Sequence, residues 1–181
     1  FALIAINLLV WILYQDHGAA PALEASVCNY GLIPGELTLS ARPGDGFDMG
    51  EGLVCLVDAG REPLNLISAM FLHGGWMHLL GNMWFLWLFG NNVEDSMGRL
   101  RFVLFYLLSG ITASFAHVWS DPNSITPMVG ASGAISGVMG AYIVLYPRVR
   151  VYCLIVIIFF VTTLAVPAWV MLGYWKIGRA S

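Results

Sequence analysis

A serine among small residues, in the run Gly130-Ala131-Ser132-Gly133, opens one apolar stretch, and His78 and Asn82 lie near the start of another. A nucleophilic serine in acyl transfer needs a base for its proton and donors for the oxygen that becomes negative. His78 and Asn82 are four residues apart, so on a helix they share one face and can both donate. The Ser132 backbone N–H, at the start of a helix, supplies a third donor. These residues predict a serine nucleophile with an oxyanion site.

A structural role for the same residues is the alternative. Amide and imidazole side chains in a membrane commonly hydrogen-bond neighbouring helices, and small residues four apart commonly allow close helix packing. Packing is therefore the favoured interpretation of Ser136, Gly137 and Gly140, which follow Ser132 on one slim side of the predicted helix. Ser132 differs because it stands at the helix start.

Composition places these residues in a membrane protein. Of 181 residues, 59% are hydrophobic and only 10% are charged, far from the balance of a soluble domain. Lipid offers no partner to backbone polar groups, so the predicted fold is an all-α, polytopic helix bundle. The five predicted spans are Phe1–Tyr14, Met77–Asn91, Phe102–Trp119, Ala131–Tyr146 and Val151–Trp175. We expect one membrane domain over residues 1–181.

Basic residues in the short loops predict the orientation. Arg99 and Arg101 separate the second and third spans, and Arg148 and Arg150 separate the fourth and fifth, so both loops should face the cytoplasm. His78, Asn82 and Ser132 then all lie near the non-cytoplasmic ends of their spans. Residues 15–76 become a long non-cytoplasmic loop.

That loop is acidic, and its second half, Pro63–Leu72, is predicted to form an amphipathic or re-entrant helix leading into His73. Its residues 15–65 carry eight acidic residues against two arginines, and no basic patch indicates nucleic acid as a partner. The acidic residues near Gly46 do not have the spacing of a calcium loop. Cys28 and Cys55 share the loop, where an oxidising compartment would allow a disulfide. The sequence alone favours unpaired thiols.

Several motifs together resemble the rhomboid intramembrane serine proteases, particularly their bacterial members. The motifs are Gly130-Ala131-Ser132-Gly133, His73-x4-His78-x3-Asn82, His73-Gly74-Gly75-Trp76-Met77-His78, Phe89-Gly90-Asn91-Asn92-Val93-Glu94-Asp95 with Gly98, and Tyr146-Pro147-Arg148. The resemblance implies Ser132 as the nucleophile, His78 and Asn82 in the oxyanion hole, and His73 as an organiser of the outer loop. It further implies that Glu94 anchors the cytoplasmic turn.

The resemblance also implies the partners: transmembrane protein substrates cleaved within the lipid bilayer, with no cofactor and no metal. The expected location is a bacterial inner membrane, with the active site open to the non-cytoplasmic side. His73 and His78 do not form the H-E-x-x-H pattern of zinc proteases, and the spans show no clear sign of a solute transporter.

The general base is the missing part of the pattern. In rhomboid proteases a histidine on the sixth span takes the serine proton, and this sequence has no matching residue. We expect the sequence to be cropped at both ends, and residues 1–181 alone to be nearly inactive. His17 and His117 are poor substitutes, because a base must reach Ser132 within hydrogen-bond distance. The alternative is a pseudoprotease that binds transmembrane helices without cleaving them.

Overall fold

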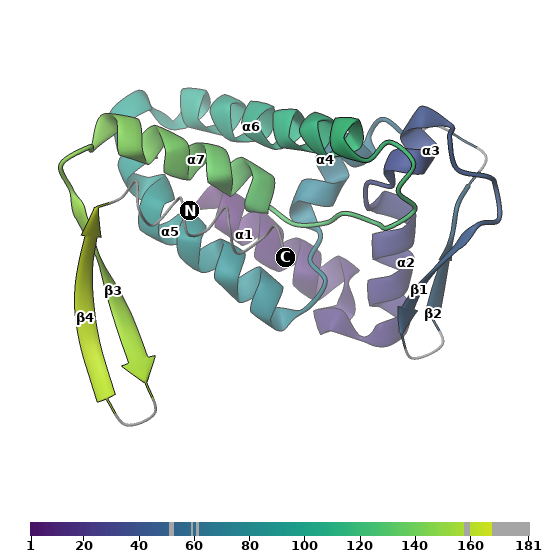
Figure 1. Ribbon diagram of the computed structural model, residues 1–181, viewed down its shortest axis with the longest axis horizontal. Helices are drawn as coiled ribbons and strands as arrows, with labels where there is room; N and C mark the ends of the chain where they lie inside the picture. The colour runs from purple at the N-terminus through teal and green to yellow at the C-terminus, as the bar shows by residue number, and fades with distance from the viewer. Residues whose placement is uncertain (51–52, 59, 61, 158–159, 168–181) are drawn as a thin grey trace. The chain divides into compact units, whose positions relative to one another are not determined.

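The computed structural model describes residues 1–50, 53–58, 60, 62–157 and 160–167, most of which are helical (Figure 1). The chain divides into two compact units, Phe1–Val138 and Met139–Ser181, so that helix α7 begins in the first and ends in the second. The elements are α1 (Ala2–Leu9), η1 (Val10–Tyr14), η2 (Asp16–Gly18), α2 (Ala20–Tyr30), α3 (Pro34–Thr38), β1 (Gly46–Gly50), β2 (Leu53–Leu56), α4 (Asn65–Ser68), η3 (Ala69–Phe71), α5 (Trp76–Met97), α6 (Arg99–Ser120), α7 (Ser132–Leu145), β3 (Arg150–Ile157) and β4 (Phe160–Pro167).

Two long helices, α5 and α6, form the frame of the first unit. A single residue, Gly98, joins them, and its φ of +86° is a conformation that favours glycine. The Gly98 N–H donates to the Glu94 carbonyl at 2.7 Å and closes the end of α5. Beside this turn the Glu94 carboxylate lies 3.9 Å from the Arg99 guanidinium. Glu94 therefore lies at the predicted turn, as expected.

The exposed surface of these helices is apolar, as a lipid environment requires. Helix α6 is the one helix of the described residues whose length and composition suit a membrane crossing, and Ala2–Tyr14 and Ser132–Leu145 are shorter apolar helices. Large exposed apolar side chains on α1, α5 and α6 include Leu9, Leu80, Trp84, Leu104, Leu108 and Phe115. In water an apolar surface of this extent would promote association.

The first helix changes character before it ends. The α-helical turns of α1 pass into the π-helical stretch η1, and four side chains spaced four residues apart, Leu3, Asn7, Trp11 and Gln15, are all buried. A π-helical insertion widens the turn, and such insertions are frequent at functional sites. The Trp11 indole packs edge-to-face on Trp76 at the start of α5, with ring centroids 5.4 Å apart.

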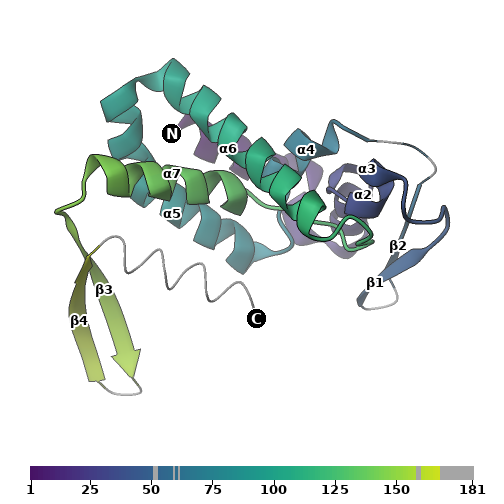
Figure 2. The same ribbon diagram turned by 45° about the horizontal axis from the view of Figure 1, so that its top comes forward.

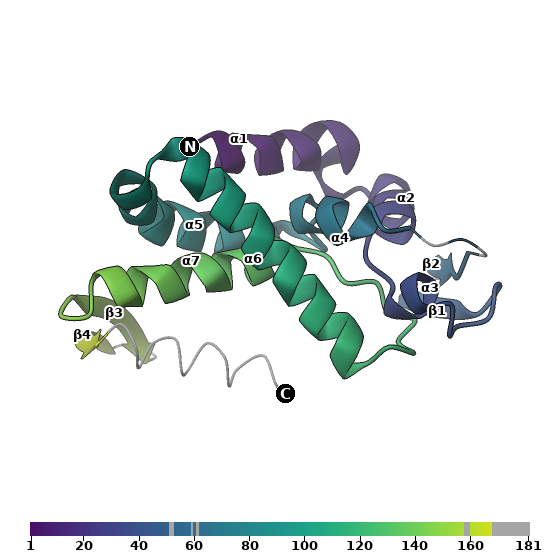
Figure 3. The same ribbon diagram turned by 90° about the horizontal axis from the view of Figure 1, so that it is seen from above.

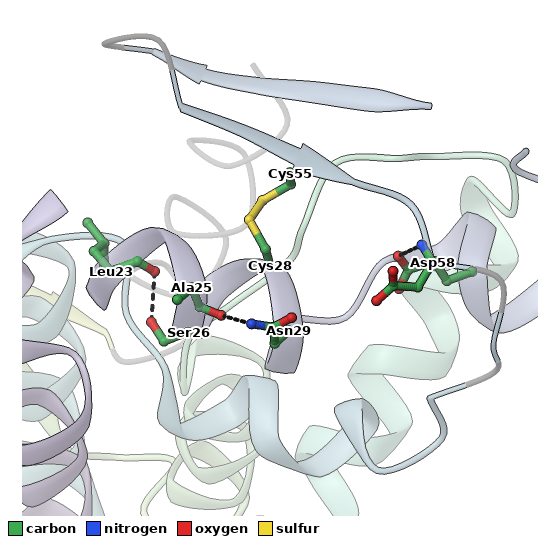
Figure 4. Close-up of a disulfide and its surroundings, with 8 residues drawn as sticks. Leu23, Ala25, Ser26, Cys28, Asn29, Cys55 and Asp58 are labelled. Carbon is green, nitrogen blue, oxygen red and sulfur yellow. Dashed lines mark hydrogen bonds between the residues drawn. A yellow bond between two sulfur atoms is a disulfide. The ribbon is translucent and has the colours of Figure 1, made fainter. Parts of the chain in front are cut away.

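The outer segment between the first and second predicted spans contains short helices and a hairpin. Strands β1 and β2 pair antiparallel, with Phe47 opposite Cys55. Cys55 forms a disulfide with Cys28 on α2, with Cα atoms 5.2 Å apart (Figure 4). The preference for unpaired thiols was therefore wrong, because the hairpin fold, which residue spacing does not reveal, brings β2 against α2.

The fold of the second unit differs from the sequence prediction. Four of the five predicted spans fall on helices, but Val151–Trp175 does not: β3 and β4 pair antiparallel, with Arg150 opposite Pro167 (Figure 2). The run is rich in Val, Ile and Thr, whose branched side chains suit extended strands. An apolar run alone does not distinguish a strand from a helix. Residues 158–159 and 168–175 of this predicted span lie outside the described residues.

Candidate active site

Gly130 brings the loop before α7 against the polar face of α5. A Cβ placed on Gly130 would lie 2.6 Å from His78 Nε2 and 3.5 Å from Asn82 Nδ2. Its φ of +117° also favours glycine over any residue with a side chain. Two residues of the predicted site, His78 and Asn82, therefore point towards the backbone that leads directly into Ser132.

Backbone pairing holds that loop in place. The Gly130 N–H donates to the Ala69 carbonyl at 2.8 Å, and Leu32 and Met128 exchange two hydrogen bonds of 3.0 and 2.8 Å. Beneath the pairing, an apolar cluster of Leu32, Leu66, Ala69 and Val118 packs with Leu37 and Met128. The segment before Ser132 is thus fixed to the outer segment, η3 and α6, and its position does not depend on α7 alone.

Ser132 is the first residue of α7 and is 6% exposed. Because it begins the helix, its N–H has no acceptor in a preceding turn and lies at the positive end of the helix dipole. Its carbonyl accepts a 2.7 Å hydrogen bond from the Ser136 hydroxyl. Within the described ranges no residue hydrogen-bonds the Ser132 hydroxyl. The hydroxyl is thus not committed to a structural contact there.

Asn82 presents a donor with no acceptor. The side chain is 4% exposed, and its Nδ2 has no hydrogen-bond partner among the residues that the structure describes. Leaving a buried donor unpaired costs roughly 1–3 kcal/mol. An acceptor that forms only during a reaction, such as an oxyanion, would be stabilised by this donor because the donor is already in position.

His78 is exposed, and its two ring nitrogens face different groups. The Gly74 N–H donates to Nδ1 at 3.4 Å, which favours the tautomer with hydrogen on Nε2. Nε2 is the atom that faces Gly130. The ring is therefore oriented to donate a hydrogen bond beside the loop that carries Ser132.

His73 is a fully buried neighbour of His78. Its ring packs edge-to-face on the His78 ring at 5.3 Å, and neither of its ring nitrogens has a partner among the described residues. Burial, and to a lesser degree the nearby His78, lowers the pKa of His73 to about 4. His73 is therefore neutral at physiological pH and supports His78 by contact alone.

Gln15 reaches this site from the end of the first helix, and the sequence prediction missed it. Its Nε2 donates to the His73 carbonyl at 2.9 Å, and the His73 N–H donates to its Oε1 at 2.9 Å. Nε2 also donates to the Ser26 hydroxyl at 3.1 Å. Asn7, Trp11 and Gln15 are four residues apart, which places them on one face of a helix. That spacing could have indicated that Gln15 is buried, as the structure shows.

Comparison with known proteins now adds to this geometry. The family model of the Rhomboid domain matches residues 60–179, which include every residue of the site except Gln15. The chain belongs to the rhomboid family. This membership confirms the predicted resemblance and identifies the chain as part of a helical integral membrane protein.

Curated relatives include proteins from plants and bacteria. The RHOMBOID-like protein 6, mitochondrial, of Arabidopsis thaliana is 44% identical over 82 residues, 45% of this chain and 26% of the relative. The putative rhomboid protease YdcA of Bacillus subtilis is 39% identical over 85 residues, 47% of this chain and 42% of the relative. The rhomboid protease GluP of the same bacterium is 45% identical over 76 residues, 42% of this chain and 14% of the relative.

The matched part of this rhomboid chain thus spans less than half the length of each of these relatives. No solved structure matches the chain.

The other two histidines of this rhomboid chain lie elsewhere. His17, in η2, is exposed and lies 3.4 Å from the Asp16 carboxylate. His117 is half-buried near the end of α6. Neither hydrogen-bonds the Ser132 hydroxyl. The described residues therefore place His78 and Asn82 beside the loop that leads into Ser132, and none of the described histidines hydrogen-bonds the hydroxyl of that serine.

Proposed function

We propose that the protein containing this chain is an intramembrane serine endopeptidase, which hydrolyses a peptide bond in or beside the transmembrane helix of another protein. The observation that carries the proposal is Gly130, which holds the start of α7 against His78 Nε2 and Asn82 Nδ2. Membership of the rhomboid family and the protease names of YdcA and GluP support it. Asn82 Nδ2 has no hydrogen-bond partner within the described part of the chain, which leaves this donor free for an oxyanion.

The proposed reaction begins when the Ser132 hydroxyl oxygen attacks the carbonyl carbon of the scissile bond. The base takes the hydroxyl proton, and the carbonyl oxygen becomes an oxyanion in a tetrahedral intermediate. His78 Nε2, Asn82 Nδ2 and the Ser132 N–H are the proposed donors to this oxyanion. Collapse breaks the C–N bond, the base returns the proton to the leaving amine, and an acyl-enzyme remains. Water then hydrolyses the ester through the same sequence.

The proposed base is a histidine outside residues 1–181 that forms a dyad with Ser132. No described residue hydrogen-bonds the Ser132 hydroxyl, which supports a base from another segment. A base must lie within hydrogen-bond reach of the proton it removes. His117 lies on α6 and is the alternative within the chain, so its substitution belongs in the same test.

The proposed site opens on the non-cytoplasmic side, and for a bacterial protein the membrane would be the inner membrane. Arg99 and Arg101 at the other end of α5 and α6 support this orientation. A disulfide between Cys28 and Cys55 also supports it, because such bonds persist in oxidising compartments. We propose residues 1–181 as one membrane domain whose segment 15–76 is the outer loop.

The experiment measures cleavage of a transmembrane substrate by the full-length protein in proteoliposomes. Ser132→Ala should abolish cleavage while thermal unfolding stays near that of the unsubstituted protein. Ser136→Ala is the matched control, because it removes a hydroxyl one turn further along the same helix. It should retain most activity.

A fluorophosphonate probe gives a second measurement, because it forms a covalent bond only with an activated serine. Mass spectrometry should locate the label on Ser132, and His117→Gln should leave the labelling rate unchanged. Retained cleavage by Ser132→Ala would exclude the serine mechanism. No cleavage and no labelling by the folded full-length protein would favour the pseudoprotease alternative.

A further inference from the structure

The Gln15 side chain hydrogen-bonds both backbone polar groups of one residue, His73, in a different part of the chain. Its side-chain amide donates to the carbonyl and accepts from the N–H of His73, both at 2.9 Å, across 58 positions of sequence. Gln15 is fully buried, as is His73. Two parallel hydrogen bonds fix direction as well as distance, so this pair sets where the His73 backbone lies.

The first helix makes a second contact with the same segment, one turn earlier. Trp11, also fully buried, packs edge-to-face on Trp76, the first residue of α5. A Cβ on Gly18 would lie 2.8 Å from the Trp11 ring, so the chain after Gln15 closes over the indole. The π-helical stretch η1 contains Trp11 and ends immediately before Gln15.

Both contacts act on the few residues that orient His78. Gly74, next to His73, donates to His78 Nδ1, and the His73 ring packs on the His78 ring. The opposite nitrogen of His78 faces Gly130. A displacement of the His73 backbone would therefore move both the donor to Nδ1 and the ring surface on which His78 rests.

We propose that Gln15 is a positioning residue of the active site, which fixes the His73–Gly74 backbone and through it the orientation of the His78 imidazole beside Gly130. Among the residues that the structure describes, the Gln15 side chain hydrogen-bonds Ser26 and His73, and none of its hydrogen bonds goes to Ser132, His78 or Asn82. The expected effect of Gln15 on the reaction rate rests on the proposed function. The expected effect on the orientation of His78 does not depend on that function.

The chemistry of the contact explains why the residue is a glutamine. Pairing with both the N–H and the C=O of His73 while also donating to Ser26 requires an acceptor and two donor hydrogens on one uncharged side chain, which only the carboxamides provide. Asparagine is shorter by one methylene group. A carboxylate accepts from the His73 N–H and, when ionised, repels the carbonyl.

The test uses NMR of the full-length protein in detergent micelles, with histidines labelled with ¹³C at Cε1. The chain has four histidines, at positions 17, 73, 78 and 117, and single substitutions assign their signals. Gln15→Met keeps the length of the side chain and removes both hydrogen-bonding atoms. It should shift the signals of His73 and His78, leave those of His17 and His117 in place, and reduce kcat at least tenfold with KM within twofold.

Asn29→Leu is the matched control, because among the described residues its side-chain amide hydrogen-bonds only the Ala25 carbonyl in its own helix, at 2.7 Å. It should leave the signals of His73 and His78 and kcat unchanged. Gln15→Glu, which keeps size and the acceptor, provides a second variant if Gln15→Met does not fold. An unchanged His78 signal in whichever variant folds overturns the proposal. Failure of the proposed protease function would appear separately, as cleavage that Ser132→Ala does not affect.

Discussion

Gly133 on α7 lies so close to Ala113 on α6 that a Cβ on the glycine would be 2.7 Å from the alanine Cβ. Helix α6 passes beside the first half of α7 in Figure 3. One turn along α7, a Cβ on Gly137 would overlap the Ser109 hydroxyl. The glycines of the predicted slim face therefore allow the first half of α7 to approach α6. The packing interpretation of Gly137 is confirmed, and the packing partner is α6.

Gly137→Ala should lower stability because the added methyl group has no space beside Ser109. Overpacking of this kind costs about 1–3 kcal/mol. Thermal unfolding in detergent measures the loss. Ser109→Gly removes the overlapping atoms, so the double variant should recover part of it. If the stability changes of the two single variants simply add in the double variant, Gly137 and Ser109 are not in close contact.

Gly130→Ala should reduce activity strongly while the protein stays folded. The new Cβ would lie 2.6 Å from His78 Nε2, and the φ of +117° is unfavourable for alanine. Displacing one oxyanion donor lowers kcat roughly 100- to 1000-fold. Gly140→Ala is a useful comparison, because a Cβ there meets no atom of the described residues within 4 Å. Equal loss in both variants would contradict the contact with His78.

Asn82→Leu should separate activity from stability. The substitution removes an amide whose Nδ2 is buried and unpaired within the described part of the chain. Activity should fall by about 2.7–4 kcal/mol of transition-state stabilisation, the effect of one oxyanion donor. Thermal stability should stay the same or rise, because an unpaired buried donor has been removed. A marked loss of stability would show that Asn82 joins helices.

Acid should destabilise the fold through His73. Its pKa is lowered to about 4 from an ordinary value of 6.5, so the unfolded chain binds a proton that the folded chain excludes. The stabilising effect of the neutral ring is complete above pH 6.5 and is lost as the pH falls towards 4. The slope approaches about 1.4 kcal/mol per pH unit in that window. His73→Phe should flatten this dependence in thermal unfolding, whereas His17→Gln should not.

Reduction of the Cys28–Cys55 bond should destabilise the outer segment. The bond closes a loop between cysteines 27 residues apart, and loops of that size contribute roughly 3–4 kcal/mol. The Asp58 N–H still donates to the Glu36 carboxylate at 2.9 Å and holds the end of the hairpin. Limited proteolysis with and without reductant should show new cleavage between residues 39 and 58. Unchanged cleavage would mean that the bond contributes little.

The sequence allowed prediction of the features that depend on local residue spacing. His78 and Asn82 share a helix face because they are four residues apart, and the loop arginines predicted the common end at which Gly130 meets them. Contacts between distant segments could not be predicted in this way. Gln15 bonds to a residue 58 positions away, and no local pattern specifies that partner.

The disulfide and the second unit show the same limit. The spacing of the cysteines did not reveal the hairpin that brings Cys55 to Cys28. A loop of this length can fold in several ways, and only some of them bring the two cysteines together. In the run from residue 151, hydrophobicity predicted a span, whereas the branched side chains in β3 and β4 favour extended backbone.

The disulfide has a consequence for biogenesis. Both cysteines precede α5 in the chain, so in the proposed topology they can reach the outer side before α6 and α7 have inserted. Their oxidation can therefore lock the outer segment, including Ser26 beside Gln15, while the later helices are still leaving the ribosome. In this order of synthesis the outer segment would already be folded when α7, which carries Ser132, packs against it.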